Sequence, residues 1–114
     1  MLVMKFGGTS VQNATSMRSV IDIVTTHAVS ESGTVVILSA TSGTTTMLLD
    51  VARAAARKHD VEESLHELNV RHRSMLSELV PGSDSVHIDD LCAELGEYLR
   101  ALSVLGECSN ESDL

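Results

Sequence analysis

The sequence is poor in aromatic side chains: among its 114 residues it has no tryptophan, one phenylalanine and one tyrosine. Any hydrophobic core must therefore use valine, leucine, isoleucine, methionine and alanine. Long apolar runs are also missing, because no stretch approaches the roughly 18 residues that a transmembrane helix needs. Lys5 and two glycines interrupt the apolar N-terminus, which excludes the h-region of a signal peptide. We expect a cytoplasmic protein with no membrane partner.

Basic residues are scarce as well. The chain has 8 Lys and Arg against 16 Asp and Glu, and a formal net charge of -8. Nucleic acids and anionic membranes favour basic surfaces, so neither is expected as a partner. The two cysteines, Cys92 and Cys108, are too few for a disulfide framework and are most simply free thiols. His66, Glu67 and His72 miss the H-E-x-x-H spacing, so no metal ligand is assigned.

The first part of the chain has the pattern of a parallel β-α-β unit. Residues 1–6 are a short apolar run that predicts a strand. Apolar residues at helical spacing predict a helix with Asn13 as its N-cap, ending before Ser32. Residues 34–38 are rich in β-branched side chains, as is typical of a parallel strand covered on both faces. A right-handed crossover is the default connection between two such strands.

Each predicted strand ends in a turn of small residues that leads into a helix. Gly7 and Gly8 follow the first strand, and the hydroxyl-rich segment 39–46 follows the second, before a predicted helix over residues 47–58. In open parallel sheets, ligands bind where such turns gather at the carboxyl ends of the strands. The two turns are therefore expected to form one wall of a ligand cleft.

The second part of the chain predicts two long helices. One begins after Asp60 and is stopped by Pro81, and the other is marked by apolar residues from Ile88 to Leu105. We expect them to form an antiparallel hairpin over residues 59–108, after a β-α-β-α segment over 1–58. A two-stranded sheet is small beside the usual about 4–6 strands. Residues 1–114 therefore resemble an incomplete, N-terminal part of a larger α/β domain.

Lys5 stands out because it is one of only two lysines and ends a predicted buried strand. A buried ammonium is costly unless an anion neutralises it. Gly7 and Gly8 let the backbone turn tightly, so that free N–H groups and the positive end of the next helix dipole can face an anion. A phosphate site is one interpretation. The other is an exposed edge lysine before an ordinary turn, since the motif is neither G-x-G-x-x-G nor a P-loop.

The segment Lys5-Phe6-Gly7-Gly8-Thr9-Ser10-Val11 resembles the signature of aspartokinases, which belong to the amino-acid kinase family. A second similarity, Leu38-Ser39-Ala40-Thr41-Ser42-Gly43, lies downstream. The resemblance implies a three-layer αβα fold with a mainly parallel sheet. It also implies ATP-dependent phosphorylation of the side-chain carboxylate of L-aspartate, the first step of lysine, threonine and methionine synthesis. Mg²⁺ would accompany ATP, and the whole protein would be a homo-oligomer, with or without a fused homoserine dehydrogenase.

The resemblance also implies roles for individual residues. Lys5 would hold the transferring phosphoryl group, and Thr45 would contact the amino-acid substrate. The other groups would bind nucleotide phosphates through N–H and hydroxyl donors, and they are Gly7, Gly8, Thr9, Ser10, Ser39 and Ala40. The second motif departs from the family pattern, because Thr46 stands where asparagine is usual and Thr44 where an apolar residue is usual. The alternative interpretation of residues 44–46 is a simple helix cap.

No general base, second basic group or magnesium ligand can be assigned in this sequence. The resemblance places the groups that hold aspartate and Mg²⁺ later in the domain, so we expect the isolated chain to be inactive. Two rival interpretations stay open. One is a relative of the same family that phosphorylates another substrate, and the other is a non-catalytic module whose helical hairpin docks onto a partner.

Overall fold

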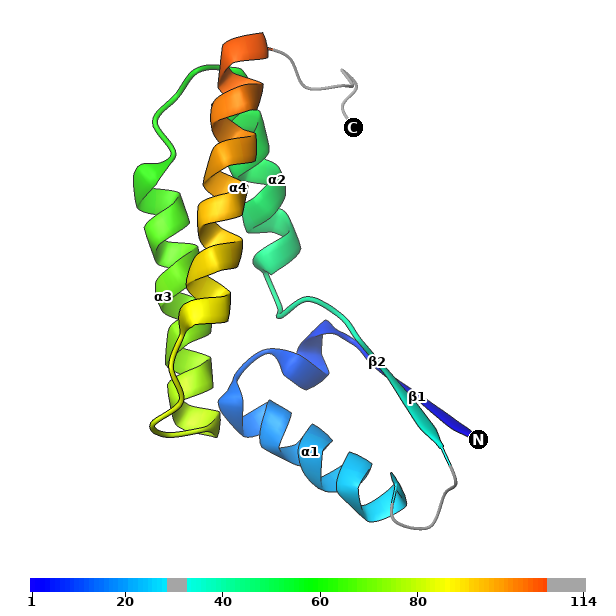
Figure 1. Ribbon diagram of the computed structural model, residues 1–114. Helices are drawn as coiled ribbons and strands as arrows, with labels where there is room; N and C mark the ends of the chain where they lie inside the picture. The colour runs from blue at the N-terminus through cyan, green and yellow to red at the C-terminus, as the bar shows by residue number, and fades with distance from the viewer. Residues whose placement is uncertain (29–32, 107–114) are drawn as a thin grey trace.

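The computed structural model describes residues 1–28 and 33–106 as a mixed α/β structure (Figure 1). The predicted end of the first helix, Cys108 and the end of the predicted hairpin lie outside these residues. In chain order the elements are β1 (Leu2–Phe6), the 3-10 helix η1 (Gly8–Val11), α1 (Ala14–Ala28), β2 (Thr34–Leu38), α2 (Thr44–Ala56), α3 (Glu62–Leu79) and α4 (Val86–Leu105). Figure 1 shows the sheet with η1 and α1 at one end, and α2, α3 and α4 side by side at the other.

The two strands pair in parallel, from Leu2 opposite Thr34 to Phe6 opposite Leu38. The predicted parallel β-α-β unit is therefore confirmed. Side chains alternate between the faces of a strand. Phe6 faces α1, with which it lines a cavity of about 260 Å³. Lys5 therefore lies on the opposite face of β1.

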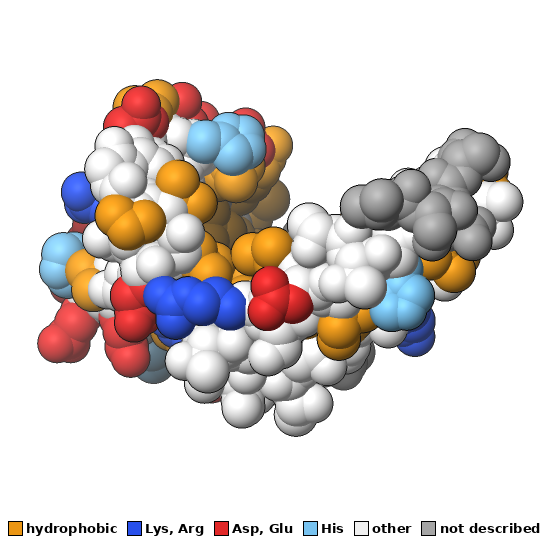
Figure 2. All heavy atoms as spheres, turned by 90° about the horizontal axis from the view of Figure 1, so that it is seen from below, with side chains coloured by type: hydrophobic (Ala, Val, Ile, Leu, Met, Phe, Trp, Pro, Cys, Tyr) orange, Lys and Arg blue, Asp and Glu red, His pale blue; other side chains and the backbone are white. Residues whose placement is uncertain are grey.

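The prediction that the second strand is covered on both faces is wrong for this chain. The side chains from Val35 to Leu38 are between 37% and 53% exposed. The reason is that α1 packs against β1, while α2, α3 and α4 gather beyond the carboxyl ends of the strands (Figure 1). Apolar side chains are also visible at the surface of the molecule in Figure 2. The apolar run predicts the strand correctly but does not guarantee its burial.

Local hydrogen bonds explain where the first two α-helices begin. The predicted cap is confirmed, because the Ser16 N–H donates to Asn13 Oδ1 at 2.8 Å. An α-helix does not follow the glycine turn directly, because the 3-10 helix η1 intervenes. The helix predicted from residue 47 instead begins at Thr44. Gly43 adopts a left-handed conformation with φ +85°, and its carbonyl accepts from the Met47 N–H at 3.0 Å, which starts the helix earlier.

The helices α3 and α4 pack side by side as the predicted hairpin, and α2 packs against both. Val51 and Ala55 of α2 and Leu99 of α4 form the buried cluster between these helices. Four partly buried residues surround it: Val61, Leu65, Leu95 and Leu102. The helical part thus has its own small core, apart from the sheet.

Within residues 1–28 and 33–106, no helix is both long and apolar enough to cross a membrane.

Asp89 fastens the end of the hairpin where α4 begins. The Asn69 side-chain amide donates to Asp89 Oδ1 at 2.9 Å, and the Ser85 hydroxyl donates to Asp89 Oδ2 at 2.9 Å. Arg73 Nε lies 3.9 Å from Asp89 Oδ1. These hydrogen bonds favour the ionised carboxylate, the bond from Asn69 most of all, and they hold the pKa of Asp89 below its ordinary value.

We expect the Asp89→Asn variant to be less stable than the parent chain at neutral pH, and the difference to shrink in acid. A carboxylate with a lowered folded-state pKa contributes stability above the ordinary Asp pKa of about 3.9, and this contribution is lost as the pH falls through the lower value. Urea unfolding of both proteins at neutral pH and near pH 3 measures the change. Asp90→Asn is the control, because Asp90 makes none of these bonds. A difference that does not vary with pH would contradict the assigned role.

Candidate active site

The turns after β1 and β2 touch at the carboxyl end of the sheet. The Ser39 N–H donates to the Phe6 carbonyl at 3.1 Å, which continues the strand pairing into the second turn. A Cβ placed on Gly8 would lie 3.4 Å from the Ala40 carbonyl oxygen and 3.7 Å from Ser39 Oγ. The backbone of the first turn therefore approaches the second within van der Waals distance, with Gly8 next to Ser39 and Ala40. That the two turns form one wall of a ligand cleft stays a prediction.

The first turn presents backbone donors at its start. Gly7 is extended, with φ -81° and ψ 179°, and η1 begins at Gly8. The Ser10 N–H donates to the Gly7 carbonyl at 3.1 Å, so of the two Ser10 donors only the hydroxyl is free for a ligand. The N–H groups of Gly8 and Thr9 have no acceptor within the described part of the chain. Val11, which is 1% exposed, anchors the turn in the interior.

Lys5 is exposed on the uncovered face of β1. The expected burial of the Lys5 ammonium is therefore wrong, and the cause is the open face of the two-stranded sheet. Its exposure agrees with the alternative interpretation of an exposed edge lysine. Among residues 1–28 and 33–106, Lys5 makes no hydrogen bond or ion pair. Lys5 directly precedes Phe6, the last residue of β1, so its backbone lies at the same end of the sheet as the glycine turn.

The second turn is held from inside by two threonines. Thr41 and Thr44 are 7% and 6% exposed, and their hydroxyl groups hydrogen-bond to each other. The Thr44 N–H also donates to the Thr41 carbonyl at 2.9 Å. Ser39 and Ala40 are exposed, as is Thr45 in the first turn of α2. The alternative in which residues 44–46 only cap the helix finds no support in the cap geometry, since the N-cap is Gly43 and no side chain makes a cap hydrogen bond there.

Arg71 of α3 reaches the second turn and was missed by the sequence analysis. One guanidinium nitrogen, Nη2, donates to the Ser42 carbonyl, and the other, Nη1, lies 3.5 Å from Met47 Sδ. Arg71 is 29 positions away from Ser42 and belongs to a different helix. No local pattern could have connected them, because the contact depends on how α3 packs beside α2.

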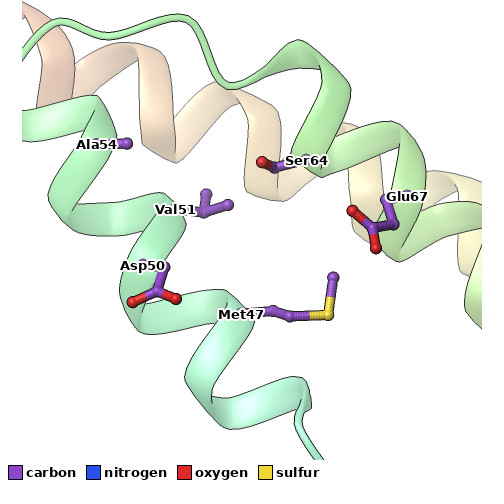
Figure 3. Close-up of a pocket in the computed structure, with 6 residues that line it drawn as sticks. All are labelled: Met47, Asp50, Val51, Ala54, Ser64 and Glu67. Atoms are coloured by element: carbon purple, nitrogen blue, oxygen red, sulfur yellow. The ribbon is translucent and has the colours of Figure 1, made fainter.

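A groove of about 350 Å³ runs between α2 and α3. Met47 and Glu67 point toward each other across it (Figure 3). The other residues that line it are Asp50, Val51, Ala54 and Ser64. Its two carboxylates and lack of a basic side chain make it unsuited to nucleotide phosphates, which favour positive groups. Within the described residues there is also no cluster of three or more histidine, cysteine or acidic side chains that could hold a metal ion.

Comparisons with known proteins agree with this architecture. Residues 1–105 match the sequence profile of the amino acid kinase family. The structure resembles that of aspartate kinase from Clostridium acetobutylicum, an allosteric enzyme, with a TM-score of 0.70 and 16% sequence identity. The similarity covers 92% of this chain and 26% of the other, so this chain spans about a quarter of that enzyme's length. No curated protein sequence matches significantly. The profile match over residues 1–105 shows that the chain belongs to the amino acid kinase family.

Proposed function

We propose that the chain is the N-terminal part of a kinase domain that transfers the γ-phosphoryl group of ATP to the side-chain carboxylate of L-aspartate. A carboxylate oxygen attacks the γ-phosphorus, the bond to the β–γ bridging oxygen breaks, and 4-phospho-L-aspartate and ADP form. The observation that carries the proposal is the contact between the Gly8 turn and the Ser39–Ala40 turn beside Lys5. Its support is that phosphoryl transfer depends mainly on positioning and charge neutralisation.

Each residue has a proposed task in this reaction. The Lys5 ammonium neutralises charge on the phosphoryl group as it moves. Gly8 and Thr9 offer free N–H groups to the nucleotide phosphates, while Gly7 allows their close approach. Four further groups bind the nucleotide, and they are the hydroxyl groups of Thr9, Ser10 and Ser39 and the backbone of Ala40. Thr45 lies at the N-terminus of α2, where its hydroxyl and the helix dipole favour a substrate carboxylate.

The described residues contain no group of three or more histidine, cysteine or acidic side chains that could hold a metal ion. No residue of this chain is assigned to Mg²⁺. Further groups for aspartate and Mg²⁺ would come from the rest of the domain. The isolated chain is accordingly proposed to be inactive.

An acyl-phosphate assay tests the substrate and the need for the rest of the domain. The chain continued into a complete kinase domain is incubated with ATP, Mg²⁺ and L-aspartate, and hydroxylamine traps the product as a hydroxamate. We expect product with aspartate and much less with glutamate, and none from residues 1–114 alone. Product from another acceptor but not from aspartate would replace the substrate assignment. Turnover by the isolated chain would contradict the proposal that it is incomplete.

We expect Thr45→Val to raise the KM for aspartate about tenfold, the usual effect of losing one hydrogen bond to a charged group. The KM for ATP should stay within about twofold, because Thr45 is assigned to the amino-acid side of the site. Thr46→Val is a matched control, since Thr46 is also an exposed threonine in the first turn of α2. Steady-state kinetics of the complete domain measure both constants. Equal effects of the two substitutions would remove Thr45 from the substrate site.

A further inference from the structure

We propose that Arg71 is a positioning residue that fixes the turn between β2 and α2 and thereby places Thr45. The part of this proposal that concerns Thr45 rests on the proposed function. The contacts of Arg71 with Ser42 and Met47, which we call the bridge, are observed among the described residues. It gives the helical hairpin a role in the site, because Arg71 lies in the middle of α3.

The guanidinium group spans the start of α2. Its Nη2 donates to the Ser42 carbonyl before the helix, and its Nη1 lies 3.5 Å from Met47 Sδ inside the helix. A Cβ placed on Gly43 would lie 3.6 Å and 3.7 Å from the same two nitrogens. Arg71 therefore contacts residues on both sides of Thr45. A planar guanidinium with several fixed donors can hold two such points at once, and its charge strengthens the bond to a carbonyl.

Ser39 ties the start of the second turn to the Phe6 carbonyl of β1, but between Thr41 and Thr44 the other hydrogen bonds of the turn are local. The Thr44 N–H donates to the Thr41 carbonyl, and the hydroxyl groups of the same two residues hydrogen-bond to each other. Ser42 and Gly43 are exposed, and Gly43 has the conformational freedom of a residue without a Cβ. Local bonds shape this part of the turn but leave it free to move relative to α3. A hydrogen bond from α3 removes that freedom, which would otherwise be lost only when substrate binds.

Amide hydrogen exchange of the 114-residue chain tests the bridge without any ligand. In Arg71→Ala we expect the Thr44 and Met47 amides to exchange about tenfold faster, as the loss of a hydrogen bond to a charged group predicts. The amides in the middle of α1 and α4 should not change. Arg18→Ala is the matched control, because Arg18 Nη2 also donates to a backbone carbonyl, that of Glu78 at 2.8 Å, away from the turn. Unchanged exchange at Thr44 and Met47 would overturn the proposal.

Kinetics of the complete kinase domain separate positioning from simple structural support. Arg71→Ala should raise the KM for aspartate about tenfold and leave the KM for ATP within about twofold. Arg71→Lys keeps the charge and one donor, so it should recover part of the loss in both experiments. If Arg71→Ala does not fold, the same exchange measurement is made on Arg71→Lys. We expect the Thr44 and Met47 amides of that variant to exchange about threefold faster than in the parent chain. No increase in their exchange rate would contradict the bridge. If Arg71→Ala speeds amide exchange in the turn but the parent domain shows no kinase activity, the proposed function is wrong and the bridge is still supported. Equal increases in both KM values would overturn the positioning role.

Discussion

Replacement of Lys5 by alanine is expected to lower kcat/KM for phosphoryl transfer by about a hundredfold to a thousandfold, the usual cost of losing one preorganised group that stabilises developing charge. Lys5 lies on the open face of β1 at the end of the sheet where the two turns meet. It has no partner within residues 1–28 and 33–106, so no ion pair or hydrogen bond within these residues has to break before its ammonium meets a phosphate. Most of the effect should fall on kcat, since the charge it neutralises grows in the transition state.

The same substitution should leave the fold almost unchanged. Exposed positions without specific contacts usually alter the free energy of unfolding by less than about 0.5 kcal/mol. Lys58→Ala is the matched control, because it removes the same charge at the far end of α2, where Lys58 Nζ donates to the Ser103 carbonyl at 2.5 Å. Kinetics and thermal unfolding of both variants separate the roles. Equal losses of activity in the two variants would show that total charge matters, and not the position of Lys5.

The fold was predictable where a signal is carried by neighbouring residues. Short apolar and β-branched runs located both strands, and Asn13 was identified as a helix cap because a cap depends on the next few residues only. The start of α2 was predicted three residues late, because the left-handed conformation of Gly43 extends the helix back to Thr44. The burial of β2 was overestimated. An apolar run indicates that a strand is suited to burial on both faces, but it does not show that this chain contains the elements that would cover those faces.

The candidate site was predictable only in part, for a similar reason. The motifs located both turns of the candidate site, and the contact between the turns follows from parallel pairing of the strands. Thr41 could have been noticed as a turn residue, but its burial depends on the helices around it. Arg71 could not have been found, because its hydrogen bond to the Ser42 carbonyl joins elements 29 residues apart. Contacts of that kind depend on tertiary packing and leave no trace in local sequence.

That packing depends on a small core, so Leu99→Ala is expected to lower the free energy of unfolding by about 2–5 kcal/mol. Leu99 is 4% exposed and lies with Val51 and Ala55 of α2 in the buried cluster between the helices. Domains have only about 5–15 kcal/mol of stability in total, so this loss is a large share. The surrounding leucines cannot fill the cavity that the substitution leaves without losing their own contacts, so closing this cavity is costly.

Urea unfolding followed by helical circular dichroism measures this effect. Leu105→Ala is the control, because Leu105 ends the same helix but is 70% exposed, and it should change stability by less than about 1 kcal/mol. Since α3 carries Arg71 and is held by the same core, Leu99→Ala should also speed exchange of the Thr44 and Met47 amides, together with those of α3 and α4. Arg71→Ala should speed exchange in the turn alone. If both variants open the turn without the helices, the core and the turn are independent, and the helical half of the chain does not support the site.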